Sequence, residues 1–147
     1  MKMKNLVFLT LSGICLFSCV SKEAENTDER RTDFATYIDA PTVIEFDKDV
    51  YNFGEVTDGE KVEHTFRFTN AGETELVLID VKGTCGCTVP ENWPKSPIAP
   101  GESGEIDVVF NSAGKVGNVQ KSIRVEANTN PTVTPLTITG KVNKKAS

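Results

Sequence analysis

Hydrophobic and polar residues alternate with a period of two through most of the chain after Pro41, a pattern typical of half-buried β-strands. The clearest run is 62–68, where one face carries Val62, His64, Phe66 and Phe68. Similar runs predict further strands at 43–46, 50–53, 106–110, 119–127 and 136–142. The segment 76–81 is almost continuously apolar, which predicts a strand covered on both faces or central in its sheet.

Turn-forming residues separate these runs. Asn70-Ala71-Gly72 and Asn130-Pro131 predict turns, and Pro100-Gly101 has the residue types of the central pair of a type II turn. The segment 111–118 contains two glycines and is expected to be a hairpin connection. With about seven strands and no helical period, the segment 42–143 is predicted to be all-β. The expected architecture is a single antiparallel β-sandwich of immunoglobulin type, with a closed barrel as the alternative.

The first 18 residues have the features of a secretory signal peptide. Lys2 and Lys4 precede an apolar run at 6–17, which is shorter than the roughly 20 residues of a membrane-spanning helix. The following Leu16-Phe17-Ser18-Cys19 resembles a bacterial lipobox, which implies cleavage before Cys19 and lipidation of its sulfur. Several acyl chains on one residue anchor a protein stably. We therefore expect the membrane to be a partner through a lipid anchor.

Residues 19–41 are polar and charged, without a sustained apolar period, and are predicted to be a lipidated N-terminus and flexible tether. Residues 144–147 are assigned as a tail. Cleavage before Cys19 would remove Lys2 and Lys4. The remaining chain would have 14 basic and 21 acidic residues, a formal net charge of −7. This charge argues against nucleic acid as a partner, because binding to phosphates needs a basic surface.

Cys85 and Cys87 flank Gly86 in a segment that also holds the only tryptophan and several prolines. Residues two apart in an extended strand are separated by about 6.6 Å, near the upper limit of about 6.8 Å for bridged cysteines. Gly86 allows a bend that shortens this distance. Three interpretations stay open: a structural pair that packs or bridges at a tight turn, a Cu(I) site, and a thiol–disulfide exchange pair.

His64 is the only histidine and lies on the apolar face of its strand. A core or edge histidine satisfied by a backbone hydrogen bond is favoured over a ligand. The alternative is a metal site of His64, Cys85 and Cys87, with copper as its cofactor; otherwise no cofactor is expected. Trp93 lies near Pro90 and Pro94 and is expected to cap the sandwich, with an exposed binding surface as the alternative.

No motif for an enzymatic reaction is present. The segment 101–105 is one residue short of the nucleophile elbow of hydrolases and precedes a predicted strand, whereas that elbow precedes a helix. There is no phosphate-binding loop and no metalloprotease motif. We therefore do not expect the chain to be an enzyme.

A series of short motifs resembles the bacterial domain-of-unknown-function family 1573, in order from about residue 45 to residue 142. The matching motifs are Asn52-Phe53-Gly54, Gly59-Glu60-Lys61, Phe66-x-Phe68-Thr69-Asn70-x-Gly72, Cys85-Gly86-Cys87-Thr88, Trp93-Pro94-x-x-Pro97-Ile98 and Pro100-Gly101-Glu102. The resemblance implies an immunoglobulin-like sandwich, similar to the ASPM-SPD-2-Hydin domains and often found on envelope lipoproteins of Bacteroidetes. It implies no reaction and no catalytic residue.

Taken together, these features predict a lipid-anchored lipoprotein of a bacterial cell envelope, with the outer membrane favoured over the inner. Its sandwich is expected to be a binding or assembly module that takes up envelope proteins or peptides by strand addition. The alternative is an envelope thiol-redox or copper-binding protein acting through Cys85 and Cys87.

Overall fold

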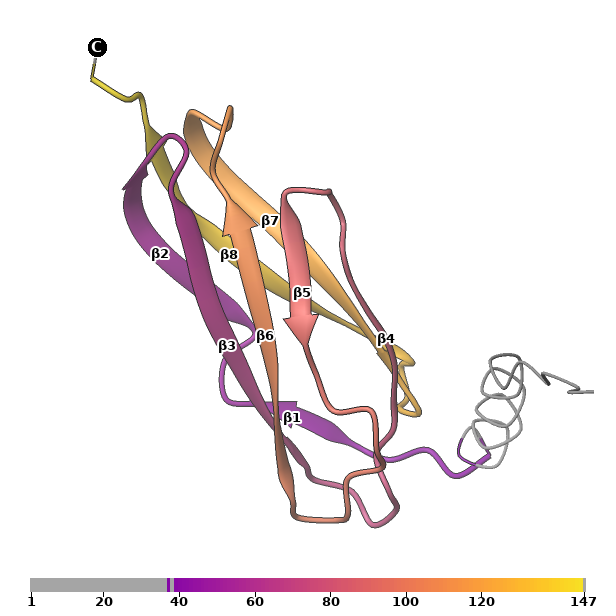
Figure 1. The fold of residues 1–147 in the computed structure, drawn as a ribbon. Coiled ribbons are helices and arrows are strands. Elements are labelled where there is room, and N and C mark those ends of the chain that lie inside the picture. Colours follow the sequence, from indigo (N-terminus) through magenta and orange to yellow (C-terminus); the bar gives the residue numbers. More distant parts are fainter. Residues whose placement is uncertain (1–36, 38, 147) are drawn as a thin grey trace, which may run out of the picture.

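A computed structural model describes residue 37 and residues 39–146 of the chain (Figure 1). The predicted signal peptide, Cys19 and most of the predicted tether lie outside the described residues. Among the residues that are described, no helix has both the length and the apolar character needed to cross a bilayer.

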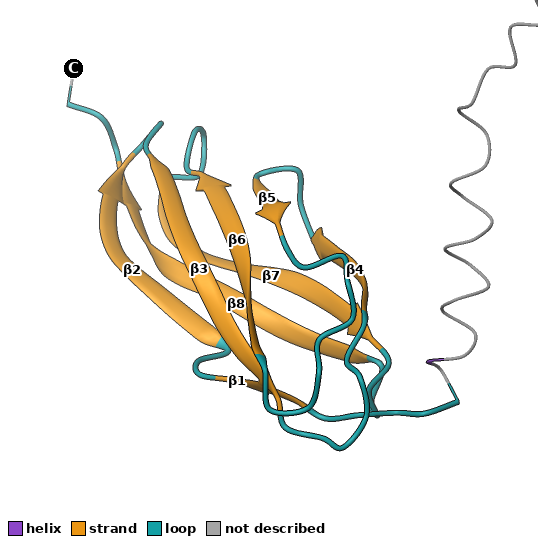
Figure 2. Cartoon of the chain, turned by 60° about the horizontal axis from the view of Figure 1, so that its bottom comes forward, coloured by secondary structure: helices purple, strands orange, loops and turns teal. Residues whose placement is uncertain are grey.

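In the described part of the chain, eight strands form two four-stranded sheets that lie in two layers (Figures 1 and 2). The strands are β1 (Ile44–Phe46), β2 (Val50–Thr57), β3 (Lys61–Asn70), β4 (Leu78–Gly83), β5 (Thr88–Asn92), β6 (Ser103–Asn111), β7 (Gly117–Ala127) and β8 (Val133–Asn143). The first sheet has the order β1-β3-β6-β5 and the second the order β2-β8-β7-β4. The predicted all-β sandwich is confirmed. It has one strand more than expected, because β5 forms within the segment that the sequence assigned to a loop.

The core lies between the two sheets and consists of the inward residues of the central strands. Those that are at most 1% exposed include Phe66, Phe68, Ile106, Val108, Phe110, Ile123, Val125, Leu136 and Ile138. Burial of each such side chain contributes about 1.5–3 kcal/mol relative to exposure. The period of two therefore placed the core correctly in the strands 62–68, 106–110 and 119–127.

Two expectations about connectivity are wrong. The segment 111–118 is not a hairpin connection, because β6 and β7 belong to different sheets. Ser112 holds this crossing: its hydroxyl donates to the Thr57 carbonyl (3.0 Å) and accepts from the Gly59 N–H (3.0 Å). The sandwich is also not wholly antiparallel, since β2 and β8 run parallel. In contrast, the predicted type II turn is confirmed, with a Glu102 N–H bond to Ala99 and φ of 79° at Gly101.

The apolar segment 76–81 is not central in its sheet, because β4 is an edge strand. Its residues are buried for a different reason. Leu76 forms a β-bridge with Ile98 of a covering loop, and the Val77 N–H donates to the Asn128 side chain (2.7 Å). Loops from both sheets thus shield the beginning of this strand from solvent.

Asn70, at the end of β3, is completely buried and uses all of its side-chain hydrogen-bonding capacity. Its Oδ1 accepts from the Thr42 hydroxyl (2.8 Å) and the Gly72 N–H (3.1 Å). Its Nδ2 donates to the carbonyls of Thr74 (2.7 Å) and Ile98 (2.9 Å). One side chain therefore joins the segment before β1, the turn after β3 and the loop before β6.

Asn128 has the same role in the second sheet. Its Oδ1 binds the Val77 N–H, and its Nδ2 donates to the carbonyls of Glu75 (2.9 Å), Tyr37 (3.3 Å) and Ala40 (3.4 Å). Its own carbonyl accepts from the Thr42 N–H (2.9 Å). Both asparagines hold the segment that leads into β1.

Replacement of Asn70 by alanine should lower the free energy of unfolding by about 3 kcal/mol, because it leaves several buried polar groups without partners. Urea denaturation measures this change. Asn118→Ala, at an exposed position, is the control and should change stability by less than about 0.5 kcal/mol. Equal effects of the two substitutions would contradict the role assigned to Asn70.

Candidate binding edge and disulfide loop

The first sheet has an interrupted edge. β1 pairs only with the end of β3, through Ile44 with Asn70, Glu45 with Thr69 and Phe46 with Phe68. One further bond joins the Asp47 N–H to the Arg67 carbonyl (3.1 Å). The chain then crosses to the second sheet and forms β2 (Figure 1). In the part of the chain that the structure describes, no strand therefore pairs with this side of residues 61–66, which we call the open β3 edge.

Backbone groups along the open β3 edge alternate in direction. In a strand, successive N–H and C=O pairs point to opposite sides. The Arg67 carbonyl points toward β1, as its bond to Asp47 shows. By alternation, the backbone groups of Lys61, Glu63 and Thr65 point the same way, and none of the described strands meets them. These groups form a short row of donors and acceptors on one side of the sandwich.

Aromatic side chains lie behind the open β3 edge. The ring of Tyr51 on β2 stacks on His64, with ring centroids 3.6 Å apart and planes within 2° of parallel. Phe66 meets the same imidazole edge-on at 4.6 Å. Burial, with a smaller contribution from the Lys48 ammonium, lowers the pKa of His64 below its ordinary value of 6.5. His64 is thus a partly buried, neutral member of an aromatic cluster.

The other three sheet edges are less regular. In β5, Pro90 has no N–H to offer, and the pairing register shifts between Pro90 and Asn92. In β2, the register shifts around Gly54, whose N–H is taken by the Asn52 side chain (2.8 Å). In β4, the register with β7 shifts next to Leu78. Such irregularities discourage strand addition, so the open β3 edge is the best-formed template.

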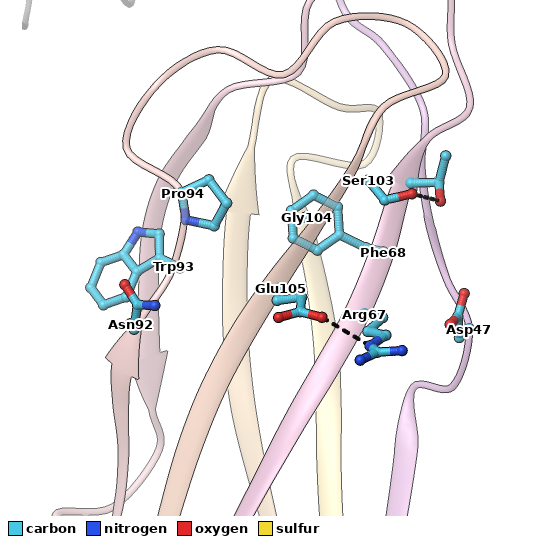
Figure 3. A pocket seen from close by; sticks show the side chains of 10 residues that line it. Asp47, Arg67, Phe68, Asn92, Trp93, Pro94, Ser103, Gly104 and Glu105 are labelled. Carbon is cyan, nitrogen blue, oxygen red and sulfur yellow. Dashed lines mark hydrogen bonds and ion pairs between the residues drawn. The ribbon is translucent and has the colours of Figure 1, made fainter.

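Trp93 lies just after β5, packs partly against the core, and borders an open groove of about 790 Å³ (Figure 3). Trp93 and Pro94 stand on one side of the groove and Asp47 on the other. An exposed ion pair between Arg67 Nε and Glu105 Oε1 (2.9 Å) crosses it. Lys95 extends its ammonium over the indole ring. Trp93 thus packs partly against the core, as expected of a cap, and its use as a binding surface stays a prediction.

Cys85 and Cys87 are joined by a disulfide in the loop between β4 and β5, with Cα atoms 5.3 Å apart. The loop is held on both sides: the Thr84 N–H donates to the Ser122 carbonyl (3.0 Å), and the Cys87 carbonyl accepts from Asn111 (2.8 Å). A ring of three residues removes little entropy from the unfolded chain, about 1.6 kcal/mol at most. The bond is therefore a weak contributor to stability.

The structure does not bring His64 to the cysteines. His64 lies opposite Val108 on β6, whereas Cys87 bonds to Asn111, three residues or about 10 Å further along that strand. Within the described residues, no three His, Cys, Asp or Glu side chains gather into a group able to hold a metal ion. His64 instead belongs to the aromatic cluster with Tyr51.

Sequence reasoning missed two features. It predicted strand addition but did not identify the open β3 edge, although the charged segment Asp47-Lys48-Asp49 between two short strands signals the crossing. It also missed Lys115 and Lys121, which line the cavity beside the disulfide. No local pattern predicts this second feature, because the lysines come from other segments.

The lowered pKa of His64 predicts a pH dependence of stability. The unfolded chain takes up a proton near pH 6.5 and the folded chain at lower pH, so the unfolded state binds more protons in between. Stability should therefore be complete above about pH 6.5 and fall as the pH drops toward the folded-state pKa. The free energy of unfolding, measured from about pH 7 to about pH 5.5, should fall more steeply in the wild type than in His64→Gln. Equal slopes would show that His64 does not contribute.

Solved structures share the fold. A protein of unknown function from Porphyromonas gingivalis W83 superposes with a TM-score of 0.60 and 17% identity, over 69% of this chain and 47% of that one. The ASH/PapD-like domain 7 of human CEP192 gives a TM-score of 0.52 and 16% identity, over 72% and 89%. The secreted serine protease VesC from Vibrio cholerae superposes with a TM-score of 0.54 and 13% identity, over 75% of this chain and 25% of that one.

At such identities the likeness concerns the fold alone, and this chain spans less than half the length of the Porphyromonas protein. No curated protein matches the sequence. The family model described as "Protein of unknown function (DUF1573)" matches residues 44–142, as the sequence motifs predicted, and the chain belongs to this family.

Proposed function

We propose that this chain is a lipid-anchored lipoprotein of the bacterial cell envelope whose sandwich is a non-catalytic binding or assembly module. Its ligand is an extended segment of another envelope protein, which adds as a strand to the open β3 edge. The observation that carries this proposal is the departure of β1 from the first sheet after Phe46. An added strand would continue the edge that β1 begins.

The side chains around this edge indicate what the segment should look like. On the inward side it would meet the aromatic pair Tyr51 and His64, which favours apolar residues at every second position. On the outward side it would lie beside the exposed charges of Lys61 and Glu63, which favours polar or charged residues in between. The ligand is therefore an amphipathic β-strand with a period of two.

Site-specific photo-crosslinking in the native envelope tests this proposal. A benzoylphenylalanine at position 63 should form an adduct with a partner peptide of period two, whereas the same group at exposed Gln120 on β7 should not. Thr65→Pro, introduced together with the crosslinker, removes one outward N–H and obstructs the added strand. It should reduce the adduct at least about tenfold, because pairing along the whole segment is disturbed.

Thr65→Val is the matched control, because it keeps the backbone N–H and should preserve the adduct. Circular dichroism establishes that both variants fold. Equal adducts at positions 63 and 120, or equal adducts in the two Thr65 variants, would exclude strand addition at this edge.

The proposed anchor rests on Cys19 and the apolar segment before it. Cys19→Ala should move the protein from the membrane fraction to the soluble fraction, because the acyl chains supply the membrane affinity. Immunoblots of fractionated envelopes measure the distribution, and Cys15→Ala, within the predicted signal, should leave the protein in the membrane. Retention of the Cys19→Ala variant in the membrane would refute lipid anchoring.

A further inference from the structure

The disulfide between Cys85 and Cys87 lies apart from the open β3 edge, since β5 and β3 stand on different sides of β6. Both cysteines are partly exposed and line an open cavity of about 480 Å³. The ring that the disulfide closes contains only three residues, so the bond adds little to the stability of the fold. A weakly stabilising disulfide that faces solvent is accessible to other thiols.

The two sulfurs have different surroundings. Cys85 Sγ lies 3.8 Å from the hydroxyl oxygen of Thr88, which is 2% exposed. A disulfide sulfur carries no hydrogen, so the hydroxyl is the donor. Within the described residues, the Thr88 hydroxyl makes no other hydrogen bond. A donor that is already aimed at Cys85 would stabilise negative charge on that sulfur when the bond breaks.

Two lysines make the cavity electropositive. Lys115, from the segment after β6, and Lys121, on β7, line the cavity together with the disulfide. Neither forms an ion pair with the residues that the structure describes. Among the described residues, none that lines the cavity is acidic. Unpaired ammonium groups attract thiolates and stabilise them after they form.

We propose that Cys85 and Cys87 are a thiol–disulfide exchange site, in which Cys87 is the sulfur attacked and Cys85 is the leaving group. The co-reactant is a dithiol reductant. Its first thiolate bonds to Cys87 Sγ, the bond between Cys87 and Cys85 breaks, and the electron pair goes to Cys85 Sγ beside the Thr88 hydroxyl. This sulfur then takes a proton from water. The assignment is independent of the proposed strand addition.

A second thiolate of the reductant completes the reaction. It attacks the reductant's own sulfur in the mixed disulfide, which closes a disulfide in the reductant and releases Cys87 as a thiolate that is protonated by water. The reductant loses two electrons and two protons, and the cysteine pair gains two electrons and two protons. Oxidation of the pair follows the same steps in reverse.

Glutathione, a monothiol, tests the order of attack because it has no second thiolate to resolve the mixed disulfide within the same molecule, so an early quench traps the mixed disulfide. The oxidised full-length protein is treated with glutathione without denaturant, quenched with N-ethylmaleimide, and analysed by peptide mass spectrometry. We expect glutathione on Cys87 and maleimide on Cys85. Glutathione mainly on Cys85, or no exchange until the protein is unfolded, would overturn the proposal.

Variants test the roles of the neighbouring groups. Thr88→Val should slow glutathione attack about fivefold, because it removes the donor to the leaving sulfur, and Thr88→Ser should restore the rate. Thr69→Val, in the first sheet but away from the loop, should leave it unchanged. Lys115→Gln with Lys121→Gln should slow the attack about threefold at low salt.

Lys48→Gln with Lys95→Gln carries the same change in net charge at positions that do not line this cavity and should not slow the attack. Thermal unfolding of each variant separates a change in reactivity from a loss of fold. An unchanged rate in Thr88→Val would refute the role of the hydroxyl and with it the assignment of Cys85 as the leaving group.

Discussion

The sandwich depends on two buried side-chain amides, Asn70 at the end of β3 and Asn128 after β7. The backbone N–H and C=O groups of a buried loop need hydrogen-bond partners, because burying them unpaired lowers the stability of the fold. Each asparagine supplies two donors and an acceptor at the place where several loops meet. Together they bind the segment around Thr42 to both sheets, which positions the beginning of β1.

The position of β1 has a consequence for the edge of the first sheet. The entry segment is held at one end of the sandwich, and from there β1 follows β3 for three residues before the chain crosses to the second sheet. The rest of β3 keeps a row of backbone groups that face no strand in the part of the chain that the structure describes. In the same region Tyr51 and His64 close the gap between the sheets by stacking. The proposed binding edge therefore begins where β1, whose entry segment the two asparagines hold, leaves β3.

Much of the fold followed from local patterns. The alternation in 62–68 identified Phe66 and Phe68 as core residues, because side chains on a strand point alternately to the two faces. The turn at Pro100-Gly101 was also predictable, since its residue types specify their own dihedral angles. The pairing of strands was not predictable, because hairpins and crossings between sheets use similar turn residues. The segment 111–118 shows this limit. Its glycines permit a turn of either kind, and the buried Ser112, which bonds to the Thr57 carbonyl, holds the segment in a crossing to the second sheet.

By itself, the amino-acid sequence determined the all-β class, the identity of the core residues, the family motifs and the proximity of Cys85 to Cys87. These properties depend on neighbours within a few residues. Only the tertiary structure decided that His64 stacks on Tyr51 instead of joining the cysteines, that Lys115 and Lys121 lie beside the disulfide, and that one edge of β3 is open. These properties depend on contacts between distant segments, which form only when the two sheets pack together.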